Sequence, residues 1–135
     1  MADISVTAAN VVPASGYQFT DGVAGETLTQ GQVVYLKAAD SRFWKAINSA
    51  AATADAVGFV LNGAAAGQPV RVQTGGNINP GGTTAVGVTY CVSGTAGGIA
   101  LDSDVVSADY KTILGVGTTT SNIAVDINVS GGVIA

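Results

Sequence analysis

The side chains that could carry acid–base chemistry in this sequence are carboxylates, because the chain has no histidine. General acid–base catalysis normally uses a histidine or a pair of carboxyl groups in a shaped pocket. One stretch gathers carboxylates, Asp102-Ser103-Asp104, with Asp109 beyond it. Oxygen ligands at alternate positions are a fragment of a calcium loop, but the glycine and the terminal glutamate of such a loop are missing. A turn or capping role is therefore favoured over calcium binding, and we expect no metal and no cofactor.

The side chains that could act as nucleophiles also lack partners. Cys91 is the only cysteine, so it excludes an internal disulfide, and its apolar strand-like surroundings favour a small core residue. No serine stands in a Gly-x-Ser-x-Gly elbow. None of the glycine pairs is followed by the Lys-Ser/Thr of a phosphate loop, so they are interpreted as strand turns. We therefore expect that this protein is not an enzyme.

Composition excludes further classes of function. Charged residues make up 10% of the chain, against about 25% in ordinary soluble domains, and the net charge is −4. Nucleic-acid binding needs a clustered basic footprint, so we expect none. No apolar run reaches the length of a membrane span, and Lys37 is the first basic residue, which leaves no basic region to open a secretory signal. The protein is expected to be made in the cytoplasm, with no membrane partner.

The elements that must position any functional residue are strands. The chain has 135 residues, which is the length of one domain. It is rich in Val, Ala and Thr, with 19 glycines and 6% aromatic residues, a composition typical of a compact β protein. Strands are predicted at 32–37, 42–46, 57–61, 68–74, 85–92, 99–101, 111–116 and 123–129. One or two helical turns are predicted within 49–56, with Asn48 or Ser49 as the N-cap. The fold class is all-β, a sandwich or a small barrel.

These strands fall into two similar units of about 55 residues, 23–76 and 82–135, which form a single domain over 23–135. Tyr35 aligns with Tyr90, and Gly58 aligns with Gly115. The glycine-rich and proline-containing stretch 75–82 is predicted to be the linker between the units. The two copies share turns, glycines and apolar alternation, whereas nearly all of their polar residues differ. The repeat therefore predicts a repeated sheet architecture and not a repeated functional site.

Residues 1–22 lie outside both units and are predicted to form an extended N-terminal arm. Short apolar alternations, interrupted by Pro13, are typical of an edge strand. The segment is either a first strand of the body or an arm that binds another subunit. Within the first unit, Phe43 and Trp44 are adjacent in a strand and must face opposite ways. One ring should then lie in the core, and an outward Trp44 would anchor an interface.

Three stretches carry a resemblance to a known family: AGETLTQGQVVYL at 24–36, DAVGFVL at 55–61 and AAAGQPV at 64–70. Their order resembles small bacteriophage proteins that decorate the capsid exterior, also described as head-fibre or capsid cement proteins. The resemblance covers about residues 23–76 and, more loosely, the second unit. It rests on turn and strand patterns and brings no fixed site residues.

The resemblance implies a non-enzymatic virion protein that binds assembled major capsid protein on the outside of the shell and stabilises it. It also implies a homo-oligomer, with a trimer favoured, and an N-terminal segment that adds a strand to the capsid. The residues expected to contact the capsid or a neighbouring subunit are Ile4, Val6, Val11, Val12, Tyr17, Phe19 and Trp44.

Two alternatives stay open. The chain could be another virion component, from a tail, a fibre or a baseplate. It could instead be a sugar-binding β module, in which Trp44, Phe43 and Tyr35 would stack on the ligand.

Overall fold

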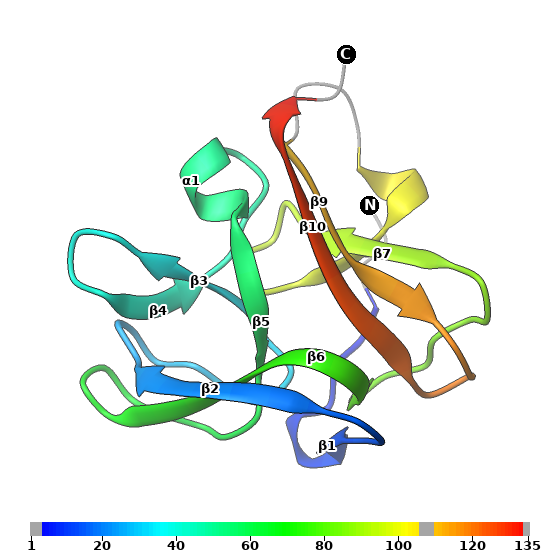
Figure 1. Cartoon of the computed structure of the whole chain (residues 1–135), viewed down its shortest axis with the longest axis horizontal. Coiled ribbons are helices and arrows are strands. Elements are labelled where there is room, and N and C mark those ends of the chain that lie inside the picture. The colour runs from blue at the N-terminus through cyan, green and yellow to red at the C-terminus, as the bar shows by residue number, and fades with distance from the viewer. Residues whose placement is uncertain (1–3, 106–109, 134–135) are drawn as a thin grey trace.

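The computed structural model describes residues 4–105 and 110–133 of the chain. It is almost entirely β, and a curled antiparallel sheet forms half a barrel, as the sequence predicts (Figure 1). The strands are β1 (Val11–Pro13), β2 (Gln18–Val23), β3 (Val33–Lys37), β4 (Arg42–Lys45), β5 (Ala56–Val60), β6 (Pro69–Pro80), β7 (Thr89–Val92), β8 (Ile99–Leu101), β9 (Tyr110–Gly117) and β10 (Ile123–Val133). The short helical turns are η1 (Ala8–Asn10), α1 (Ala51–Ala54) and η2 (Asp102–Asp104). No helix in the described ranges is long and apolar enough to cross a membrane.

The strand order follows the duplication seen in the sequence. The sheet runs β4-β3-β5-β6-β10-β9-β7-β8, and β1 and β2 add to β6 from outside this path. In each half a hairpin is followed by a strand that pairs with the hairpin's first strand, and a fourth strand pairs with the third. The two halves join where β6 pairs with β10. One set of connections is therefore used twice.

Glycines at equivalent sites allow the same close backbone approach in both halves. A Cβ on Gly58 would lie 1.9 Å from the carbonyl oxygen of Gln73, and a Cβ on Gly115 would lie 2.1 Å from that of Ala124. Gly58 pairs with Val34, and Gly115 pairs with Tyr90, with a β-bulge after each pair. The strand pairing thus matches Tyr90 with Val34, which is one residue away from the predicted match with Tyr35. In a strand a one-residue slip turns a side chain to the other face, so the predicted match would have placed Tyr35 on the wrong face of the repeat.

The predicted linker at 75–82 is wrong, because most of it belongs to β6. This strand continues through Gly75 and Gly76 to Pro80, and it changes neighbours on the way. Its first part pairs with β2 and β5, and its last part pairs with β1 and β10. Gly76 has a φ of +77°, where a Cβ would meet the backbone of Gly16. The glycines let one strand bend between two sets of partners, which a composition rule interprets as a linker.

The described part of the N-terminal segment lies along the body, the first of the two alternatives left open by the sequence. β1 pairs with residues 78–80 of β6, and β2 pairs with its residues 69–75. Upstream, the amide of Ile4 donates to the carbonyl of Ile99 at 3.0 Å, and the amide of Thr7 donates to Gly81 at 2.8 Å. These contacts join residues 46 or more positions apart, so the described part of the segment belongs to the sheet of this chain.

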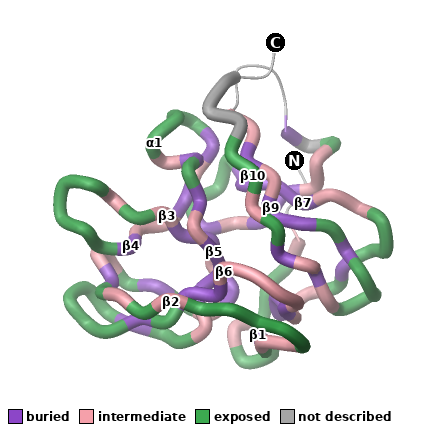
Figure 2. The backbone as a smooth tube through the Cα atoms, in the orientation of Figure 1, coloured by how far each residue is buried: buried purple, intermediate pink, exposed green. Residues whose placement is uncertain are grey.

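The core has two main parts. A central cluster joins both halves and includes Phe59, Ile78, Tyr90 and Leu114, each at most 1% exposed. A second cluster lies within the first half, around Leu28, Phe43 and other buried residues of β3, β5 and β6. Figure 2 shows the contrast between the buried central strands and the outer strand β2, which is exposed along much of its length. β2 therefore offers an exposed outer surface.

Two local predictions need correction. The strand expected at 85–92 begins only at Thr89, because Ala85–Val88 form a turn in which Gly87 takes a φ of +79°. The predicted helical turn exists as α1, but its N-cap position is Ala50 and no side chain caps it. Asn48 is buried instead and donates from Nδ2 to the carbonyl of Val92 at 3.3 Å. Asn48 therefore ties the loop before α1 to the end of β7.

Candidate binding surface on strand β2

The outer face of β2 carries the largest exposed side chains of the N-terminal segment. Phe19 is 45% exposed on the strand, and Tyr17, which directly precedes it, is 42% exposed. Gly22 points to the other face, where a Cβ would strike the ring of Phe43. This alternation follows from the period of a strand, in which successive side chains face opposite ways. β2 therefore closes the second core cluster with one face and offers aromatic side chains with the other.

The exposed rings are ordered by contacts with one another and with Arg71. The rings of Tyr17 and Phe19 are stacked, with centroids 5.9 Å apart and planes at 28°. The guanidinium carbon of Arg71 lies 4.0 Å from the centroid of Phe19. A guanidinium over an aromatic face is held by the quadrupole of the ring. The result is a column of Tyr17, Phe19 and Arg71, which we name the aromatic column.

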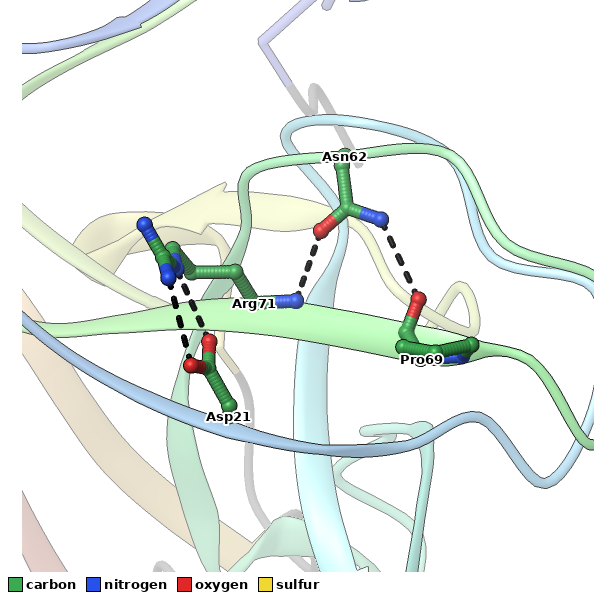
Figure 3. A network of polar contacts seen from close by, with 4 residues as sticks. All are labelled: Asp21, Asn62, Pro69 and Arg71. Carbon is green, nitrogen blue, oxygen red and sulfur yellow. Dashed lines mark hydrogen bonds and ion pairs between the residues drawn. The ribbon is translucent and has the colours of Figure 1, made fainter.

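An acidic residue and an amide fix Arg71 in this position (Figure 3). Nε of Arg71 donates to Asp21 at 2.8 Å, and a terminal nitrogen donates to the second carboxylate oxygen at 3.2 Å. The two residues face each other across β2 and β6. The backbone amide of Arg71 donates to the side chain of Asn62 at 2.6 Å, and Asn62 donates to the carbonyl of Pro69 at 3.2 Å. Asp21 therefore holds the guanidinium group of Arg71, and Asn62 holds its backbone.

The ion pair shifts the titration of both partners. The hydrogen bond from Arg71 lowers the pKa of Asp21 below its usual 3.8, and the hydrogen bond to Asp21 raises the pKa of Arg71. Both side chains are exposed, so water and salt screen the pair and its stabilising effect is small. At neutral pH the pair contributes no net charge to this surface.

A shallow hollow of about 440 Å³ lies beside the ion pair. Its lining includes Asp21, Leu61, Asn62, Pro69 and Arg71. The polar atoms of Asn62 and Asp21 that face this region already bond to the protein. The arrangement suits contact with a surface better than capture of a small polar ligand, which needs free donors and acceptors.

The other residues expected to contact a partner are dispersed. Ile4 is half-buried and packs against the central core. Val11 is only 7% exposed and belongs to that core, so its side chain is not available to a partner. Val6 and Val12 are exposed at 37% and 53%. Of the seven expected residues, the described contacts bring only Tyr17 and Phe19 together as a pair of rings.

Trp44 lies on the hairpin of β3 and β4, and its ring is largely occupied. Phe43 is buried and Trp44 is half-buried, so the two rings take opposite faces as predicted. The indole nitrogen of Trp44 donates to the carboxylate of Asp40 at 3.2 Å, and the ammonium of Lys37 lies 4.6 Å from the ring centroid. The ring also lies against Gly25, where a Cβ would come within 2.3 Å. Because Phe43 faces the core, it cannot share a sugar platform with Trp44 and Tyr35, which lie opposite each other across β3 and β4.

The carboxylates near residue 102 have structural partners. Asp102 begins the turn η2, forms an ion pair with Lys111, and accepts the thiol of Cys91 at 3.6 Å. Burial, and secondarily the charge of Asp102, raises the pKa of the Cys91 thiol to about 12, which keeps the thiol protonated. Asp109 lies outside the described residues. No group of three or more potential metal ligands occurs in the ranges 4–105 and 110–133.

Asp21, Asn62 and Arg71 join this surface although none of them is among the residues that the sequence predicts to contact a partner. Arg71 alternates with the buried Val70 and Val72, and this signal places it on an exposed face. Its pairing with Asp21, 50 residues away, depends on the register of β2 against β6, which no local pattern encodes.

The chain has no match among models of known protein families, and no curated protein sequence matches it significantly.

Proposed function

We propose that this protein is a non-enzymatic virion component that binds the outside of an assembled phage capsid and stabilises the shell. The proposal rests on the resemblance of residues 23–76 to capsid decoration proteins. The observation that supports it best is the aromatic column, which exposes Tyr17 and Phe19 within the N-terminal segment. Aromatic residues with a neighbouring arginine are the side chains that most often dominate the energetics of protein interfaces.

The chemistry of this surface supports binding. Asp21 and Arg71 neutralise each other, and the rings are held in place before a partner arrives. An ordered surface loses less conformational entropy on association than a mobile one.

The direct test is co-sedimentation of the purified protein with undecorated capsids. We expect wild-type protein to pellet with the capsids and the double variant Tyr17→Ala/Phe19→Ala to pellet at least tenfold less well. The matched control is Val86→Ala, which removes an exposed apolar side chain, 68% exposed, from a loop elsewhere. Failure of the wild-type protein to bind capsids would overturn the proposal. Equal binding by all three proteins would show that the aromatic column does not contact the capsid.

A tail, fibre or baseplate role is the main competitor. Tail-tube proteins assemble into rings, so electron microscopy of the isolated protein separates the two roles. Rings or tubes would favour the tail role, whereas discrete small particles that bind capsids favour the proposed one.

A further inference from the structure

The connection between β5 and β6 contains an asparagine that can react with its own backbone. Asn62 is followed by Gly63, and both residues are exposed. An asparagine loses its side-chain amide when the backbone nitrogen of the next residue attacks the side-chain carbonyl carbon, which makes it a thermolabile residue. Glycine at the next position favours this attack, because it has no Cβ to obstruct the approach and its backbone is the least restricted.

The sequence singles out Asn62 among the seven asparagines of the chain. Asn79 precedes Pro80, whose nitrogen carries no hydrogen to give up. Asn48 precedes a serine, but it is 2% exposed and its amide is bonded to Val92. Each of the others precedes a valine or an isoleucine, whose branched side chain stiffens the residue and crowds its nitrogen. These four are Asn10, Asn77, Asn122 and Asn128.

The attacking nitrogen is accessible in the folded chain, whereas the side chain that it attacks is held. Among the described residues the amide of Gly63 donates to no partner. The side chain of Asn62 points to β6 (Figure 3), where Oδ1 accepts from the amide of Arg71 at 2.6 Å and Nδ2 donates to Pro69 at 3.2 Å. Nδ2 is the atom that leaves, so its bond to Pro69 must break first. The contacts with β6 therefore slow the reaction at an otherwise open site.

We propose that Asn62 is a site of spontaneous deamidation, whose product alters the surface beside the aromatic column. The nitrogen of Gly63 bonds to Cγ of Asn62, and the side-chain nitrogen leaves as ammonia with the proton of the Gly63 amide. Water then opens the cyclic imide at either carbonyl, which yields aspartate or isoaspartate at this position. Water is the only co-reactant. The inference stands independently of capsid binding.

The product changes the charge of this surface. Asp21 and Arg71 neutralise each other, so a new carboxylate at position 62 leaves their surroundings with a net negative charge. A carboxylate oxygen in place of Nδ2 would also face the carbonyl oxygen of Pro69. Two acceptors cannot bond to each other, so the contact that fixed this connection to β6 is lost.

Isoaspartate also lengthens the backbone, because it adds a methylene to the main chain at residue 62. The connection is anchored on both sides of this point. The amide of Leu61 donates to Arg71 at 2.8 Å, and the amide of Ala64 donates to Leu28 at 3.0 Å. The added length must bulge between these anchors and disturbs the bond from the Arg71 amide. Arg71 belongs to the aromatic column, so the column loses part of its support.

The first experiment incubates the folded protein at mildly alkaline pH, which favours loss of the amide proton. Ion-exchange chromatography follows the acidic product, and peptide mapping locates it. We expect position 62 to be modified before any other asparagine. Gly63→Ala, whose Cβ has room in the fold, should slow the reaction about tenfold, and Asn10→Gln should leave the rate unchanged. Earlier modification of another asparagine, or equal rates with and without Gly63→Ala, would overturn the proposal.

The second experiment tests the hold of β6 on the Asn62 amide. In urea-unfolded protein the reaction at this position should be about tenfold faster, because two hydrogen bonds no longer restrain the amide. Asn62→Asp reproduces the charge of the product and should lower the unfolding temperature by roughly 3–6 °C. Asn10→Asp adds the same charge to an exposed side chain elsewhere and is the matched control. Equal rates in the two states, or equal unfolding temperatures for the two variants, would contradict the proposed effect on this surface.

Discussion

Val11 offers a sharp test of whether the N-terminal segment is part of the folded body. Its side chain is 7% exposed in the central core, whereas its neighbour Val12 is 53% exposed on the same short strand. Val11 contacts the region around Gly31 and Gly81, where an added Cβ would lie within about 3 Å of its methyl group. The substitutions Val11→Ala and Val12→Ala therefore remove the same atoms from opposite faces of β1.

The expected magnitude follows from the buried atoms. Val11→Ala removes two methyl-sized groups worth about 0.8 kcal/mol each, and an additional cavity cost raises the loss of unfolding free energy to about 2–3 kcal/mol. Val12→Ala should cost less than about 0.5 kcal/mol, as is usual for surface positions. Urea unfolding followed by circular dichroism measures both. With a slope of about 2 kcal/mol per molar urea, the midpoint of Val11→Ala should fall by about 1 M at unchanged slope.

Equal urea midpoints for the two variants would show that β1 is not part of the folded core. The N-terminal segment would then be a separable arm. If Val11→Ala is destabilised as expected, deletion of residues 2–20 removes structure as well as any binding surface. Point substitutions on the exposed face, such as Tyr17→Ala and Phe19→Ala, are then the proper probes of binding.

Three further predictions concern the interior and the charged pairs. Gly58→Ala and Gly115→Ala should each lower the thermal unfolding temperature strongly, because the new Cβ would collide with a backbone carbonyl, whereas at Gly63 the nearest atom lies at 3.9 Å and Gly63→Ala should have little effect. Asp21 has a lowered pKa in the folded state, so its ion pair with Arg71 adds a small stabilisation above the unfolded value near 3.8, which is lost as the pH falls through the lower folded value. An NMR titration should place the pKa of Asp21 below 3.8 in the wild-type protein and higher in Arg71→Gln, and equal values in the two proteins would contradict the ion pair. Cys91 should resist thiol reagents at pH 8 in the folded protein and react on unfolding, because its pKa is raised to about 12; rapid labelling of the folded protein would show that the thiol is accessible.

Alternation and turn residues were sufficient to predict the all-β class and most strands from the sequence. The positions of β3, β4, β5, β8 and β9 agree with the expected strands to within a residue or two at each end. Alternation also separated Phe43 from Trp44, since it depends only on the local geometry of a strand. The duplication indicated the repeated connections, although the pairing showed the match of Tyr35 with Tyr90 to be one residue off.

The pairing register of strands that are far apart in the chain could not be predicted from the sequence. Glycine is equally compatible with a linker and with a bend in a strand, so Gly75 and Gly76 gave no sign that β6 continues to Pro80. The burial of Val11 depends on pairing with a strand almost 70 residues later. The column of Tyr17, Phe19 and Arg71 likewise arises from the pairing of β2 with β6, so only its first two members were expected as surface residues.

The position of β6 has a consequence for how the chain folds during synthesis. β1 and β2 find their partners only in residues 69–80, so they must wait until more than half of the chain has left the ribosome. Long-range pairing of this kind slows folding, because loop closure precedes the contacts that stabilise it. During that interval the apolar segment around Tyr17 and Phe19 is unpaired and open to association with other chains. Slow translation before residue 80, or growth at high expression levels, should therefore raise the aggregated fraction of this protein.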